Sequence, residues 1–147
     1  MSRVPALGLA LLLSACSSDD SKPAAVPQDP TFTRVVSEVL RAKNCGANGA
    51  LCHALAAGGF KLGSNDAIYK ELLDEDAGGT ECTPNAEAGV PARKRVIPND
   101  PENSLLYQKI AVDPPACGDP MPKGQPPLDP PQIQLVYDWI KAGAQND

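Results

Sequence analysis

The sequence predicts an all-α fold made of short helices and long, stiff loops. Apolar residues recur at helical spacing in four segments after residue 30, and no stretch alternates strictly enough to predict a strand. The chain has 12 Gly and 16 Pro among its 147 residues, which favours extended loops between the helices. This length is typical of a single domain.

Two helices are expected in the first half of the domain. Thr31 can cap the first one, and its apolar stripe at helical spacing consists of Phe32, Val35, Val36, Val39 and Leu40. Ser64 and Asn65 are cap candidates for a second, short helix over about residues 66–75. The apolar face of this second helix is formed by Ile68, Tyr69, Leu72 and Leu73.

Two further helices are expected near the C-terminus, and both begin at an Asp-Pro pair. Asp100-Pro101 places a cap before a proline at the first helical position, where the missing N–H costs nothing. Asp129-Pro130 does the same for the last helix, and Gly143 is placed to end it. Their apolar residues are Leu105, Leu106 and Ile110 in the third helix and Ile133, Val136, Trp139 and Ile140 in the last.

The first fifteen residues have the features of an export signal. Arg3 gives a basic start, and residues 4–13 form an apolar run that is too short to span a bilayer. The run ends in Leu13-Ser14-Ala15-Cys16, which resembles the lipobox of bacterial lipoproteins, whose Cys is lipidated and becomes the new N-terminus. An ordinary secretory signal with a nearby Cys is the alternative.

This interpretation divides the chain into a signal peptide over residues 1–15, a lipidated Cys16 with a flexible tether over 16–30, and a folded domain over 31–147. The expected location is the cell envelope, anchored to the membrane by lipid and facing the periplasm or the cell surface. Ser17, in place of an Asp, slightly favours the outer membrane. A net charge of −5 argues against a nucleic-acid partner, because nothing neutralises phosphates.

The chain has five cysteines, and lipidation of Cys16 leaves four. Two long loops, residues 76–98 and 111–131, contain Cys82 and Cys117. A disulfide between these two is expected in an oxidising compartment, and closing such a loop contributes about 3–4 kcal/mol in the chain-entropy model. Cys45 and Cys52 would then either form a second disulfide or attach a cofactor.

Cys52-His53 is the dipeptide with the clearest chemical meaning. His53 is the only His, and Met121 is the only Met once the signal is removed. A Cys that forms a thioether, a His directly after it and a Met from a distant loop are the groups that hold a covalent haem. One His cannot build a blue copper site, and the cysteine spacing lacks the clustered pairs of a zinc site.

Other residues have expected structural roles. Trp139 is expected in the core, and Arg93-Lys94-Arg95 is expected to form a solvated turn, with a docking patch for an acidic redox partner as the alternative. The candidates for a pocket wall are Phe60, Leu62, Tyr69 and Leu106.

Four segments carry a family resemblance: Cys52-His53, residues 96–106 (VIPNDPENSLL), residues 117–122 (CGDPMP) and residues 139–144 (WIKAGA). Together they resemble the c-type cytochrome domains of secreted and lipid-anchored bacterial proteins, particularly the planctomycete-type cytochrome c group. The resemblance covers roughly residues 32–145 and implies a cytochrome c-like fold in which the first and last helices cross. It implies that His53 is the proximal haem ligand, Met121 the distal ligand and Cys52 the second haem cysteine.

The cysteine spacing departs from the family pattern, which usually has two residues between the haem cysteines. Here six residues separate Cys45 from Cys52, giving C-x6-C-H. Turn-forming residues in this segment could bring Cys45 back toward Cys52. The sequence thus predicts a lipoprotein that carries haem c and passes electrons to a redox partner in the envelope, with no enzymatic activity. The alternative is a haem-free, disulfide-stapled lipoprotein that acts as a binding or scaffold module.

Overall fold

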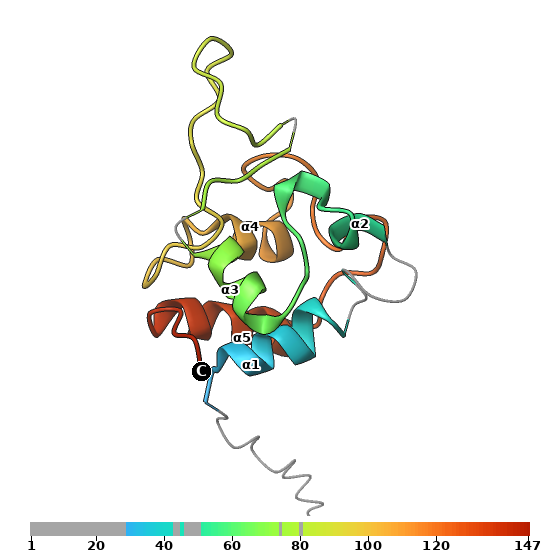
Figure 1. Cartoon of the computed structure of the whole chain (residues 1–147), viewed down its shortest axis with the longest axis vertical. Helices are drawn as coiled ribbons and strands as arrows, with labels where there is room; N and C mark the ends of the chain where they lie inside the picture. Colours follow the sequence, from blue (N-terminus) through green and yellow to red (C-terminus); the bar gives the residue numbers. More distant parts are fainter. Residues whose placement is uncertain (1–28, 43–44, 46–50, 74, 80) are drawn as a thin grey trace, which may run out of the picture.

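The computed structural model describes residues 29–42, 45, 51–73, 75–79 and 81–147, with only the backbone of Leu51 and Cys52. Across these residues the chain forms helices joined by long loops, with three isolated bridges and no strand (Figure 1). The all-α prediction is therefore confirmed. The expected signal peptide over 1–15, Cys16 and the tether up to residue 28 lie outside the described residues.

The helices are short, as predicted. In chain order they are α1 (Phe32–Arg34), the π-helix η1 (Val35–Leu40), α2 (Leu51–Ala54), the 3-10 helix η2 (Ala57–Gly59), α3 (Asn65–Leu72), α4 (Leu105–Ala111) and α5 (Pro130–Lys141). None of the helices in the described part of the chain is long and apolar enough to cross a bilayer.

Local signals in the sequence set several helix ends. The Thr31 hydroxyl accepts the N–H of Arg34 at the start of α1, and the Ser64 hydroxyl accepts the N–H of Ala67 at the start of α3. Helix α3 ends at Leu72, three residues before the predicted end at 75. The reason is that Leu73 adopts an extended conformation and pairs with Val96 in a parallel bridge.

The predicted start of the third helix at Asp100-Pro101 is wrong, because α4 begins at Leu105 with Ser104 as its N-cap. Pro101 instead lies in a turn, in which the N–H of Ser104 donates to the Pro101 carbonyl at 3.1 Å. Ser104 is fully buried. Its hydroxyl accepts the N–H of Ile97 at 2.8 Å and donates to the Asp100 carbonyl at 2.8 Å. These bonds hold Ser104 in an extended conformation, so a helix cannot run through it.

The predicted bounds of the last helix are confirmed. Asp129 and Gln132 form a reciprocal capping box at the start of α5, in which the N–H of Asp129 donates to the Gln132 side chain at 3.1 Å. Gly143 follows the C-cap with a φ of +99°, a conformation that favours glycine. The N–H groups of Gly143 and Ala144 donate back to Ile140 and Trp139, which completes a Schellman ending.

The core lies where α1 and η1 pack across α5 (Figure 1). Phe32 contacts Trp139 and Tyr69, with ring centroids 5.3 and 5.2 Å apart. Trp139 is buried as predicted, and its indole N–H donates to the Gln145 carbonyl at 2.9 Å. The whole predicted stripe of the first helix is buried, namely Phe32, Val35, Val36, Val39 and Leu40.

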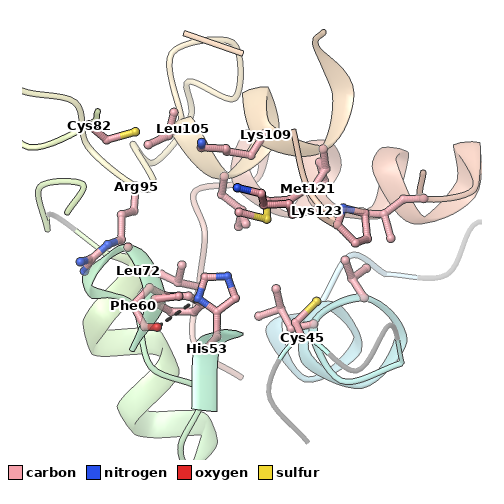
Figure 2. A pocket seen from close by; sticks show the side chains of 18 of the residues that line it. Cys45, His53, Phe60, Leu72, Cys82, Arg95, Leu105, Lys109, Met121 and Lys123 are labelled. Atoms are coloured by element: carbon pink, nitrogen blue, oxygen red, sulfur yellow. Dashed lines mark hydrogen bonds between the residues drawn. The ribbon is translucent and has the colours of Figure 1, made fainter. Parts of the chain in front are cut away.

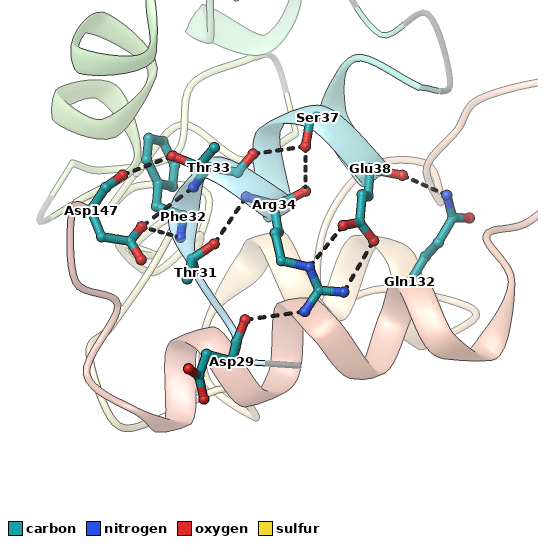
Figure 3. Close-up of polar contacts among 9 residues, drawn as sticks. All are labelled: Asp29, Thr31, Phe32, Thr33, Arg34, Ser37, Glu38, Gln132 and Asp147. Carbon is teal, nitrogen blue, oxygen red and sulfur yellow. Dashed lines mark hydrogen bonds and ion pairs between the residues drawn. The ribbon is translucent and has the colours of Figure 1, made fainter. Parts of the chain in front are cut away.

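Polar contacts tie the first helix to the last part of the chain (Figure 3). The Asp147 carboxylate accepts the N–H of Phe32 at 2.6 Å, and the Thr33 hydroxyl donates to the Asp147 main chain at 2.8 Å. At the other end, the Gln132 amide donates to the Glu38 carbonyl at 2.6 Å. These contacts fix the crossing of the two helices from both sides.

The two long loops are joined to each other and to the helices. Cys82 and Cys117 form the predicted disulfide, with Cα atoms 5.4 Å apart. The loop over 76–98 also packs closely on η2, because a Cβ on Gly78 would lie only 2.7 Å from the carbonyl oxygen of Gly58. Glycine at position 78 therefore permits this close approach.

Candidate functional site

An apolar pocket of about 280 Å³ lies between the helices and the loop over residues 111–131. It brings together three of the predicted site residues, Cys45, His53 and Met121, whose side chains face the same space (Figure 2). Cys52 lies in α2 directly before His53, but its side chain is outside what the structure describes. Cys82 lines the pocket as well, through its place in the disulfide.

The ring of His53 contacts Phe60 in two ways. Its Nδ1 lies 3.1 Å from the carbonyl oxygen of Phe60, and the two aromatic rings meet edge to face at 5.2 Å. A carbonyl oxygen can only accept a hydrogen bond, so Nδ1 carries the proton. In the neutral ring this leaves a lone pair on Nε2, which is the arrangement of a metal-ligating histidine.

Main-chain hydrogen bonds place His53 beside Cys45. The N–H of His53 donates to the Cys45 carbonyl at 3.1 Å, and the His53 carbonyl accepts the N–H of Leu62 at 3.0 Å. Residues 45, 53 and 62 therefore lie next to one another although eight or more positions separate them. The expected turn that could bring Cys45 back toward Cys52 falls on residues 46–50, which lie outside the described residues.

Met121 reaches the pocket from the Pro-rich loop, and α4 holds it there. Its N–H donates to the carbonyl of Lys109 at 2.7 Å. The Lys109 ammonium in turn donates to the carbonyl of Asp119 at 3.0 Å. Four residues before Met121, Cys117 fixes the same loop through the disulfide to Cys82. The loop is thus held at three points close to Met121.

Cationic residues are among those that line the pocket, namely Arg95, Lys109 and Lys123. Lys109 is half-buried, and burial lowers its pKa, an effect that the negative charge of Asp119 partly opposes. The pKa of Asp119 is lowered by the hydrogen bond that it accepts from Lys123. Arg95, on the wall near His53, lies 5.9 Å from the centre of the Phe60 ring. An apolar cavity whose lining includes these cationic groups suits a largely apolar ligand that also carries negative groups.

The prediction of the pocket wall is confirmed for two of its four residues. Phe60 and Leu106 line the pocket as predicted, whereas Leu62 and Tyr69 do not and pack against the core instead. The remaining apolar wall comes from residues that were assigned to helix faces or not assigned, among them Val39, Leu40, Leu72, Leu105, Ile110 and Leu128.

The expectation of a solvated turn at residues 93–95 is wrong for Arg95. Its guanidinium donates to the carbonyls of Glu71 at 2.7 Å and Gly59 at 2.8 Å, and it lines the pocket. Lys94 is half-buried and pairs with Asp76 at 3.1 Å. The run of three basic residues was a visible signal, but the partners of Arg95 are carbonyl groups, which no side-chain pattern reveals.

Comparison with models of known protein families, with curated proteins and with solved structures found no match.

Proposed function

We propose that this protein is a lipid-anchored, single-haem c-type cytochrome that passes electrons to a partner in the cell envelope. The observation that carries the proposal is that His53 and Met121 line the same pocket. The chain's only His and the only Met after the expected signal face one apolar pocket, although 68 positions separate them. An imidazole and a thioether are a common axial ligand pair of electron-transfer haems.

The residues of the pocket fit a haem in their chemistry. His53 has its Nε2 lone pair turned away from the Phe60 carbonyl, as an axial ligand requires. Met121 offers a neutral sulfur, which raises the reduction potential of the iron that it binds. Cys45 lines the pocket, and Cys52 directly precedes His53, so these two are the proposed thioether positions.

When bound, the haem would supply the one-electron chemistry, while the chain binds, orients and shields it. Filling both axial positions with His53 and Met121 favours electron transfer over the activation of a substrate. The apolar wall would shield a bound haem from water, which would add to the rise in potential that Met ligation gives. A cytochrome c-like fold, in which first and last helices cross, is part of this proposal.

The first experiment is expression of the full chain in a bacterium that has a haem-attachment system. The purified protein should be red, show an α-band when reduced, and stain for haem on a denaturing gel because the bond is covalent. A colourless protein in which Cys45 and Cys52 are linked by a disulfide would contradict the proposal. That outcome would favour the haem-free, disulfide-stapled binding module.

Two substitutions test the axial ligands in the red protein. His53→Ala should change the spectrum grossly, because it removes the proximal ligand. Met121→Leu should keep the haem attached but lower the reduction potential, since the side chain has similar size and no sulfur. Leu55→Ala is the control, because Leu55 lies close to His53 in sequence but is 72% exposed. If both ligand variants match this control, the ligand assignment is wrong.

The anchor is tested separately from the haem. We propose that Cys16 is lipidated and that it tethers the domain to the envelope membrane, with the outer membrane slightly favoured. Cys16→Ser should release the protein from the membrane fraction and abolish incorporation of labelled fatty acid. Incorporation that persists in the variant would contradict this assignment. The haem colour should not depend on it.

A further inference from the structure

We infer that Arg95 is a positioning residue for His53, acting through the main chain that carries the Phe60 carbonyl. The inference rests on the proposed function only in one respect, namely that the imidazole would bind a haem iron. The contact itself, between Nδ1 of His53 and the oxygen of Phe60, exists in the chain alone.

The first step is that the Phe60 carbonyl decides the state of His53. The ring has no other polar contact among the described residues, so this oxygen sets both its orientation and its tautomer. If the carbonyl moved, the Nδ1 proton would be exposed to water, and the direction of Nε2 into the pocket would no longer be fixed. Whatever holds residues 59–61 therefore holds the imidazole.

The second step is that Arg95 holds this segment to α3. One end of its guanidinium donates to the Gly59 carbonyl at 2.8 Å, and the other donates to the Glu71 carbonyl at 2.7 Å. The Glu71 carbonyl lies in the last turn of α3, where carbonyl groups lack helical partners. A planar guanidinium can bridge two such oxygens at once, which a lysine ammonium on a flexible stem does poorly.

The third step is that the other contacts of this segment reinforce the same link. The guanidinium also lies against the Phe60 ring, 5.9 Å from its centre. The carboxylate of Glu71 accepts the N–H of Lys61 at 2.9 Å, on the far side of Phe60. Phe60 is thus flanked on both sides by residues tied to Glu71, and Arg95 supplies one of the two ties.

The test uses the fact that His53 is the only His in the chain. Protein labelled with ¹⁵N-histidine gives side-chain signals from one imidazole alone, its Nδ1 and Nε2, with or without haem, provided that any haem is kept reduced with ascorbate. The spectrum reports which ring nitrogen carries the proton, and the exchange of that proton with water reports how well it is held. Haem content is read from the colour of the unmodified protein, so failure of the proposed function and failure of this inference are distinguishable.

Arg95→Gln and Arg95→Lys are the test variants, and Arg41→Gln is the matched control. Arg41 also bridges to the α3 region, through the Gly63 carbonyl and the Asn65 side chain, but it does not touch Gly59 or Phe60. We expect exchange of the Nδ1 proton to become at least about tenfold faster in both Arg95 variants. In the Arg41→Gln protein it should stay close to the unmodified rate.

The lysine variant keeps the charge and most of the stem, so it carries the test if Arg95→Gln does not fold. Arg95→Lys with an unmodified exchange rate would overturn the inference, because the charge alone would then suffice. Equal acceleration in Arg41→Gln would overturn it as well, because general loosening of the α3 region would explain the effect.

Discussion

The main-chain N–H of Met121 donates a hydrogen bond to the carbonyl oxygen of Lys109 across 2.7 Å. The side chain of the same lysine donates to the Asp119 carbonyl at 3.0 Å, so one residue of α4 holds the loop at two positions. The main chain of Met121, which carries the proposed axial sulfur, is therefore hydrogen-bonded to a helix, although it lies in a loop rich in proline. The strength of this attachment can be tested without changing the methionine.

Lys109→Met removes the bond to Asp119 but keeps an apolar stem in the pocket wall and leaves the main-chain bond to Met121. In the haem-loaded protein, added imidazole should displace Met121 more easily, with an affinity higher by about three- to tenfold, the value of one lost hydrogen bond. Optical titration measures this. The control is Lys123→Met, because Lys123 contacts the exposed carboxylate of Asp119 instead. Equal affinities in the two variants would contradict the role of Lys109.

Ser104→Ala should destabilise the fold by about 1–3 kcal/mol, because Ser104 is fully buried and its loss leaves the part-buried N–H of Ile97 without its acceptor. Urea unfolding of the full chain measures this. Ser37→Ala is a close control: Ser37 also donates to the carbonyl four residues earlier, at 2.9 Å, but it is exposed. Its loss should change the free energy of unfolding by less than about 0.5 kcal/mol. Similar losses at both positions would argue against a special role for the buried hydroxyl.

The disulfide between Cys82 and Cys117 closes a loop with a sequence separation of 35. The double variant Cys82→Ala/Cys117→Ala should lose about 3–4 kcal/mol of stability, mainly because the unfolded chain gains entropy. Calorimetry or urea unfolding gives the value, and peptide mapping without reductant should recover the two cysteine peptides linked. Recovery of both as free thiols from the unmodified protein would refute the bridge.

Acid should weaken the ion pair between Arg34 and Glu38, whose atoms lie 2.8 Å apart on one face of the first helix. The hydrogen bond from Arg34 lowers the pKa of Glu38 below its ordinary value of 4.5. The unfolded chain therefore binds the proton first as pH falls, and the stability from the pair, present above pH 4.5, is lost below it.

The measurement is the difference in unfolding free energy between the unmodified protein and Glu38→Gln. It should be about 0.3–0.5 kcal/mol at neutral pH and low salt, and should shrink stepwise below pH 4.5. Glu87→Gln is the control, because Glu87 is exposed in the long loop over 76–98. A difference that is the same at every pH would show that the charge of Glu38 is not its source.

Local sequence signals predicted the helices where the deciding contacts are local. Thr31, Ser64 and Asp129 each cap the helix that follows, and Gly143 ends the last one, because these roles depend on neighbours within a few residues. The start of α4 could not be predicted this way. Asp100-Pro101 is a sound local signal, but the burial of Ser104 and its bond to Ile97 override it.

The residues of the candidate site divide in the same way. His53, Met121 and Cys45 were selected for their chemistry and rarity, and the structure brings these three to one pocket. Arg95 and Lys109 were not assigned to the site, because their roles depend on main-chain oxygens, the Gly59 carbonyl being 36 positions from Arg95. No periodicity or spacing in a sequence reports such a contact. The role of the Cys52 side chain in the site stays a prediction from the sequence, because this side chain lies outside what the structure describes.

The hydrogen bonds by which Arg95 and Lys109 hold the segments around the pocket go to main-chain carbonyls and not to side chains. At position 119, any residue that keeps the local backbone can present the carbonyl that Lys109 binds, so this position is free to change its amino acid while Lys109 is kept. Gly59, whose carbonyl Arg95 binds, has a φ of +72°, a conformation that favours glycine, so position 59 is not free in the same way. Loop redesign or random mutagenesis of this domain should therefore tolerate many replacements at position 119 and few at positions 95 and 109. The geometry of the site would then be kept by the side chains of Arg95 and Lys109 and by the path of the backbone, even where the amino acid at position 119 changes.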